Sequence, residues 1–226
     1  ADTVGVFQIE SRAQMNMLPR LVPKNFYDIV IEVAIVRPGP LQGGMVHPYL
    51  RRRQGLDPVV YDHPALEPIL SKTLGVPIFQ EQVMKMAVAV GGFSAGEADQ
   101  LRKVMSGAWR NKSKMNVLQE KLMRGMRASG LSEDIVARIY KTIDGFGEYG
   151  FPESHSASFS ILSYISAWLK VHHPVEFVTA LLNSQPMGFY SAHSLIADSK
   201  RHGIKFLSHD ISLSGWEHRT VPDCFR

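Results

Sequence analysis

The segment that most constrains the fold is a glycine-punctuated loop that runs directly into a long apolar stretch. Residues 145–156 read GFGEYGFPESHS, and residues 156–172 are apolar on nearly every side. Such a helix is typical of the centre of a helical domain. A loop this rich in glycine loses much backbone entropy on folding, and on a rigid helix it usually brings the chain close to a ligand. A plain tight turn between helices is the alternative interpretation.

Most of the remaining chain also follows a helical pattern. A Ser94-Ala95-Gly96-Glu97 sequence is a capping box that predicts the start of a helix carrying Arg102 and Lys103. Apolar periodicity and turn residues predict further helices over residues 26–36, 64–70, 81–90, 115–128, 133–143, 156–172, 174–182 and 192–202. The predicted fold class is therefore mainly α, with a few short extended segments such as residues 76–79 and an irregular end after residue 204.

Charge is mild overall but unevenly distributed. Lys and Arg number 25 against 21 Asp and Glu, a net charge of +4. Between residues 101 and 127 the only acid is Glu120, whereas the basic residues are Arg102, Lys103, Arg110, Lys112, Lys114, Lys121, Arg124 and Arg127. Arg51, Arg52 and Arg53 form a second cluster. Such clusters favour a polyanion partner, phosphate or nucleic acid, over the alternative of a solvated helix face.

Several common chemistries are excluded by the sequence. The single cysteine, Cys224, rules out a disulfide framework and a cysteine zinc site, and it fits a reducing cytoplasmic setting. There is no signal peptide pattern, no P-loop and no His-Glu-x-x-His motif. Serines and Lys170 make the long apolar stretch too polar to span a membrane. Nothing in the spacing of Ser154, His155 and Asp144 supports a hydrolytic triad.

Phosphate recognition is the chemistry that remains after these exclusions. Arg102 and Lys103 are adjacent on one predicted helix, where an arginine fork and a lysine point charge can clamp a triphosphate. Arg110 and Lys112 follow on a connecting segment. Gln80 begins another helix and could orient a base or ribose, although ordinary helix capping is an equal alternative.

Five blocks in this order carry a resemblance to a known family. They are residues 5–12 (GVFQIESR), 37–42 (RPGPLQ), 79–84 (FQEQVM), 98–105 (ADQLRKVM) and the loop at 147–156. Together they cover most of the chain and resemble the alpha subunit of bacterial DNA polymerase III, the C family of DNA polymerases. Residues 45–53, 108–110, 151–155 and 182–190 look like the damage-inducible, error-prone branch. The replicative branch has a lysine-containing segment where this chain has Pro152-Glu153.

The resemblance implies a mainly α-helical fingers domain that binds the incoming deoxynucleoside triphosphate (dNTP) and the DNA primer-template. Arg102 and Lys103 match the basic pair that holds the triphosphate, although the family usually has two arginines there. The other nucleotide-binding residues that we expect are Gln80, Gly150, Ser154 and His155. The residues expected to contact DNA phosphates are Arg37, Arg51, Arg52, Arg53, Arg110 and Lys112.

The resemblance also implies which parts of the enzyme lie outside this chain. Residues 1–60 are expected to be the palm-proximal start of the fingers, residues 61–205 the helical core, and residues 206–226 the truncated start of the following segment. The family's metal-binding aspartates lie in the palm, so Mg²⁺ is expected for the full enzyme without a catalytic or metal-ligating residue here. A sliding clamp and lesion-bypass accessory proteins are expected as partners of the full-length cytoplasmic protein, and no membrane.

Two other interpretations remain open at this point. The chain could come from the replicative alpha subunit, with the same chemistry and different fidelity. It could also be a helical nucleic-acid-binding module without catalytic activity, derived from a polymerase.

Overall fold

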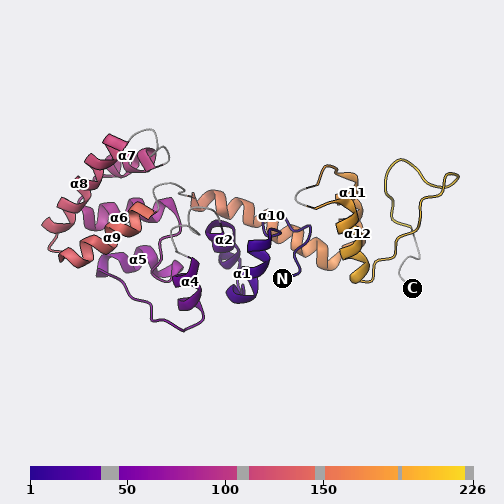
Figure 1. The fold of residues 1–226 in the computed structure, drawn as a ribbon, viewed down its shortest axis with the longest axis horizontal. Coiled ribbons are helices and arrows are strands. Elements are labelled where there is room, and N and C mark those ends of the chain that lie inside the picture. Colours follow the sequence, from indigo (N-terminus) through magenta and orange to yellow (C-terminus); the bar gives the residue numbers. More distant parts are fainter. Residues whose placement is uncertain (37–45, 106–111, 146–150, 188–189, 222–226) are drawn as a thin grey trace. The chain divides into compact units, whose positions relative to one another are not determined.

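The computed structural model describes residues 1–36, 46–105, 112–145, 151–187 and 190–221 (Figure 1). These residues fall into two compact units. One unit contains Ala1–Pro19 together with Phe159–Arg226, and the other contains Arg20–Ser158. The described regular structure is helical, as predicted, and extended backbone pairs in an isolated parallel bridge between Phe79 and Phe151. The segment boundaries expected at residues 60 and 205 concern functional parts of the enzyme and stay predictions.

The unit Arg20–Ser158 is built around α6, which packs against α7 and α8, and α8 packs in turn against α9. The inner face of α6 buries Val83, Met86, Ala87 and Val90 almost completely. The helices of this unit are α2 (Phe26–Ile35), α4 (Val46–Arg53), α5 (Glu67–Leu70), α6 (Gln80–Gly91), α7 (Ala95–Met105), α8 (Lys112–Ala128), α9 (Glu133–Gly145) and the start of α10 (Glu153–His172). Short 3₁₀ turns flank α5 at Pro64–Leu66 and Ser71–Thr73.

Local sequence signals set several helix ends in this unit. The predicted capping box is confirmed, because the Ser94 backbone N–H donates to the Glu97 carboxylate at 3.0 Å and the Glu97 N–H donates to the Ser94 hydroxyl at 3.4 Å. Asn25 and Asp28 form a second capping box at the start of α2. α8 begins at Lys112, earlier than the predicted start at residue 115.

The unit of Ala1–Pro19 and Phe159–Arg226 has its own small core. Phe177, Val178 and Leu182 of α11 (Pro174–Asn183) pack with Leu195 of α12 (Ala192–Arg201) and with Ile204. α1 (Arg12–Leu21) begins in this unit. Pro174 opens α11 as predicted, and Gly203 follows α12 with a φ of +85°, a left-handed conformation that favours glycine. Residues 204–221 are irregular, also as predicted.

The expectation that α10 is buried on all sides is wrong. Its serines Ser156, Ser160 and Ser163 are fully buried. Large apolar side chains of the same helix are between 45% and 72% exposed: Ile161, Leu162, Tyr164, Ile165, Trp168 and Val171. The buried hydroxyls have partners, since Ser156 donates to the Val30 carbonyl at 2.5 Å and Ser163 donates to the Phe7 carbonyl at 2.8 Å. The packed face of α10 is thus its small polar face.

Among the described residues, no helix has the length and apolar character needed to cross a lipid bilayer.

Candidate functional site

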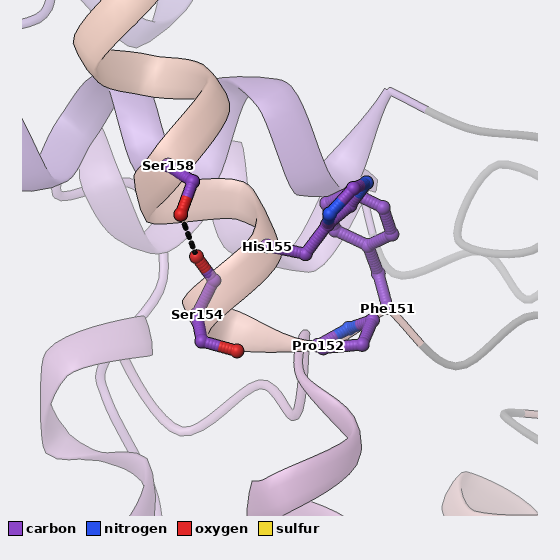
Figure 2. Close-up of a pocket in the computed structure, with 5 residues that line it drawn as sticks. All are labelled: Phe151, Pro152, Ser154, His155 and Ser158. Atoms are coloured by element: carbon purple, nitrogen blue, oxygen red, sulfur yellow. Dashed lines mark hydrogen bonds between the residues drawn. The ribbon is translucent and has the colours of Figure 1, made fainter.

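A shallow, open pocket of about 610 Å³ lies at the start of α10 (Figure 2). Its lining residues are Phe151, Pro152, Ser154, His155 and Ser158. The rings of Phe151 and His155 meet edge to face, with their centroids 5.1 Å apart at an angle of 72°. The Ser158 hydroxyl donates to the Ser154 carbonyl at 2.9 Å. Two of the predicted nucleotide-binding residues, Ser154 and His155, are therefore brought together, and Gly150 lies outside the described residues.

The first turn of α6 holds the chain that forms this pocket. The Gln80 backbone N–H donates to the Phe151 carbonyl at 3.1 Å, beside the bridge between Phe79 and Phe151. The Glu81 carboxylate accepts a hydrogen bond from the Glu153 backbone N–H at 3.0 Å, which caps the N-terminus of α10. Gln80 thus lies next to the pocket through its backbone, and it is not among the residues that line it.

Tyr27 of α2 is a residue at this site that sequence reasoning missed. Its hydroxyl donates to Glu153 Oε1 at 2.5 Å. Its ring packs at the edge of Phe79, with the centroids 6.4 Å apart, and Lys72 Nζ lies 5.2 Å from the ring centroid. Burial and the neighbouring Glu153 carboxylate raise the pKa of Tyr27. Tyr27 and Glu153 are 126 positions apart, so no spacing signal in the sequence could have indicated the contact.

The predicted triphosphate pair, Arg102 and Lys103, lies on α7 and does not line the pocket. Both side chains bind the carboxylate of Asp99 on the same helix: Arg102 Nη2 to Oδ1 at 2.8 Å, and Lys103 Nζ to Oδ2 at 2.7 Å. The hydrogen bonds from Lys103 and Arg102 lower the pKa of Asp99. The Lys103 side chain is 65% exposed, so this member of the pair faces solvent. Contact with a nucleotide stays a prediction.

The three consecutive arginines of α4 have internal partners. Arg53 binds both carboxylate oxygens of Asp28, at 2.7 and 2.6 Å, and it also donates to the carbonyls of Leu21 and Val22. Arg52 donates to the Leu74 carbonyl at 2.7 Å, and Arg51 forms a bidentate pair with Asp57. Their contact with DNA phosphates stays a prediction. Of the other residues predicted to contact DNA, Arg37 and Arg110 lie outside the described residues, and Lys112 is the first residue of α8.

Asp2, Asp198 and His202 are close enough together to hold a metal ion. The charge at this cluster is already balanced, however, because Lys170 Nζ lies 3.1 Å from Asp2 and 3.2 Å from Asp198, and Arg201 binds Asp198 at 2.7 Å. The Asp198 carbonyl and the Asp2 carboxylate raise the pKa of His202. With two cationic side chains on its carboxylates, the cluster does not fit a catalytic Mg²⁺.

Comparison with known proteins agrees with the resemblance seen in the sequence. The family described as bacterial DNA polymerase III alpha subunit finger domain matches residues 1–130. An error-prone DNA polymerase of Methylococcus capsulatus is 60% identical over 222 residues, which is 98% of this chain and 21% of that protein. Error-prone DNA polymerases of Alkalilimnicola ehrlichii and Bordetella bronchiseptica are 60% and 58% identical, over 97% and 96% of this chain and 22% and 20% of their own lengths.

The chain therefore spans about a fifth of the length of these curated relatives. The finger-domain match covers more than half of the chain, and the high identity extends over nearly all of it. This chain belongs to the bacterial DNA polymerase III alpha subunit family, the C family of DNA polymerases, within its error-prone branch.

Proposed function

We propose that this chain is the fingers part of an error-prone, DNA-directed DNA polymerase and that it binds the incoming dNTP and the nascent base pair. The observation that carries the proposal is the pocket at the start of α10, because it gathers Ser154 and His155 beside an aromatic ring on a firmly held helix start. Family membership supports the reaction class, and the pocket supports the assignment of nucleotide binding to this segment.

The chemistry of the pocket suits the base and sugar of a nucleotide. Phe151 and His155 offer ring surfaces, Ser154 and Ser158 offer hydroxyls, and none of the described lining residues is a lysine, arginine, aspartate or glutamate. The triphosphate needs cations, which Arg102 and Lys103 supply on α7. Their shared partner Asp99 holds the two side chains side by side. A triphosphate carries more negative charge than this carboxylate and would compete with it for both cations.

DNA phosphates are assigned to the remaining predicted basic residues, Arg37, Arg51, Arg52, Arg53, Arg110 and Lys112. Arg51 is more available than Arg53, since its pair with Asp57 is at the surface and its side chain is 43% exposed. Arg53 is 20% exposed and is bound on several sides, so its contribution to DNA binding is indirect, through the position of α4.

In the full-length enzyme, the primer 3′-hydroxyl attacks the α-phosphate of the dNTP and pyrophosphate leaves. Carboxylates outside this chain would hold Mg²⁺, which would supply charge stabilisation for that step. This segment contributes binding and orientation of the nucleotide. We place the enzyme in the cytoplasm, in translesion synthesis and DNA repair, with a sliding clamp and lesion-bypass accessory proteins.

The test is single-nucleotide incorporation by the full-length polymerase carrying His155→Ala or Ser154→Ala. Loss of a base contact should raise the KM for dNTP about tenfold for His155→Ala, with a smaller rise for Ser154→Ala. His193→Ala, an exposed histidine on α12, is the matched control and should keep the wild-type KM. An unchanged KM in His155→Ala would refute nucleotide binding at this pocket.

A further inference from the structure

Three side chains from outside the pocket converge on the first turn of α10. They are Tyr27 of α2, Glu81 of α6 and Glu153 of α10 itself. We propose that they are positioning residues for nucleotide binding, with the hydrogen bond between Tyr27 and Glu153 setting the orientation of Ser154 and His155. This inference rests on the proposed function of the pocket.

The bond between Tyr27 and Glu153 is short and held on both sides. The Tyr27 hydroxyl lies 2.5 Å from Glu153 Oε1, a distance typical of a strong hydrogen bond to a carboxylate. The edge of Phe79 and the ammonium of Lys72 fix the Tyr27 ring in place. Because the pKa of Tyr27 is raised, its hydroxyl keeps its proton and remains a donor at physiological pH.

The backbone on either side of Pro152 is fixed by the first turn of α6. The Gln80 N–H binds the Phe151 carbonyl, and the Glu81 carboxylate accepts from the Glu153 N–H. Proline itself restricts φ at the position between them. With residues 151 and 153 fixed in this way and the Glu153 side chain held by Tyr27, the directions of Ser154 and His155 are determined.

None of these three residues lines the pocket, so their effect passes through the backbone of α10. A small displacement of His155 weakens a contact that the nucleotide makes equally before and during the reaction, so the loss falls on binding. The positioning role therefore predicts a change in KM for dNTP without a matching change in kcat. A purely structural role predicts a lower melting temperature and a normal KM in the folded enzyme.

The experiment measures steady-state incorporation and thermal unfolding of the full-length polymerase with four changes. They are Tyr27→Phe, Glu153→Ala, their double variant, and Glu153→Gln. We expect Tyr27→Phe and Glu153→Ala each to raise the KM for dNTP about three- to tenfold, with kcat within about twofold. The KM of the double variant should not exceed that of the more impaired single variant, because both changes remove the same bond. Glu153→Gln keeps an acceptor for the Tyr27 hydroxyl and should remain near the wild-type KM.

Two further variants, Tyr164→Phe and His155→Ala, separate this inference from the proposed function. Tyr164→Phe removes a hydroxyl from an exposed tyrosine of α10 and should leave the KM unchanged. If His155→Ala raises the KM while Tyr27→Phe and Glu153→Ala do not, or if their effects multiply in the double variant, the positioning role is wrong and the proposed function stands. A Glu153→Gln enzyme as impaired as Glu153→Ala also overturns the role. If His155→Ala itself has a normal KM, both proposals fail together.

Discussion

Gly125 of α8 packs directly against the backbone of Gly91 at the end of α6: a Cβ at Gly125 would lie 1.8 Å from the Gly91 carbonyl oxygen. A Cβ at Gly91 would in turn lie 2.3 Å from Cδ1 of the fully buried Leu122. The two helices can therefore approach this closely only because neither position carries a side chain. This crossing supports the helical core that carries the first turn of α6.

Gly125→Ala should lower the free energy of unfolding by about 2–4 kcal/mol, because backbone must move to admit the methyl group. Gly96→Ala is the matched control, since Gly96 lies in α7 and a Cβ there would meet nothing within 4 Å. That control should be neutral or stabilising by up to about 1 kcal/mol, from the higher helix propensity of alanine. Urea unfolding followed by circular dichroism measures both, and equal stability of the two variants would contradict the close crossing.

Glu32 makes stability fall with rising pH. The side chain is fully buried in α2, neither carboxylate oxygen has a hydrogen-bond partner in the part of the chain that the structure describes, and burial raises its pKa from 4.5 to about 8. Between these two values the folded protein keeps the proton and the unfolded chain releases it, so folding loses free energy as pH rises from about 4.5 to about 8.

Glu32→Gln removes this titration. The stability of the variant relative to wild type should therefore increase from pH 5 to pH 8.5, by on the order of 3 kcal/mol. Unfolding measured across this range tests the prediction. A difference between the two proteins that is independent of pH would show that Glu32 titrates normally.

His202 also makes stability fall with rising pH, because it contributes stability in its protonated form. Its pKa is raised because the Asp198 carbonyl and the Asp2 carboxylate interact with its ring, so the protonated form is favoured in the folded state. This contribution is complete below about pH 6.5 and is lost as pH rises through the folded pKa. The ring is 40% exposed, which limits the effect to less than about 1 kcal/mol.

The change that tests this is His202→Gln, compared with His209→Gln in the exposed tail. The first should lower stability at pH 5.5 and have less effect at pH 8, whereas the second should have no effect at either pH. Melting temperatures at the two pH values are the measurement, and a larger effect at pH 8 would reverse the sign that the structure predicts.

Arg53 and Arg51 differ sharply in burial, although they are neighbours in one run of three arginines. Arg53→Ala leaves the Asp28 carboxylate, which is 4% exposed, without its cation and should destabilise the fold by about 2–4 kcal/mol. Arg51→Ala breaks a surface pair and should change stability by less than about 1 kcal/mol. Chemical unfolding distinguishes them, and similar losses for both would mean that the pairs contribute equally.

Features governed by short-range interactions were predictable from the sequence. The capping box of Ser94 and Glu97 joins residues three apart, and Pro174 and Gly203 act at a single position. The helical fold class follows from many such local signals added together. The grouping of Ser154 and His155 in one pocket was accessible for the same reason, since both lie in one helical turn.

Features that depend on distant contacts were not predictable. The apolar character of α10 does not show which face of the helix is packed. Ser156 and Ser163 face inward because the backbone carbonyls of Val30 and Phe7 accept hydrogen bonds from their hydroxyls. A run of arginines shows charge without showing that Asp28, 25 residues away, binds one of them. The contact between Tyr27 and Glu153 likewise depends on the tertiary fold, which brings the two residues together.

The central claim is that this segment binds the incoming nucleotide, and Arg102 tests it most directly. The measurement is the dNTP concentration dependence of single-nucleotide incorporation by the full-length polymerase with Arg102→Ala. The control is Arg138→Ala, which removes an exposed arginine paired with Asp62. We predict that Arg102→Ala raises the KM for dNTP about tenfold or more while Arg138→Ala leaves it unchanged. A wild-type KM in Arg102→Ala would contradict the account.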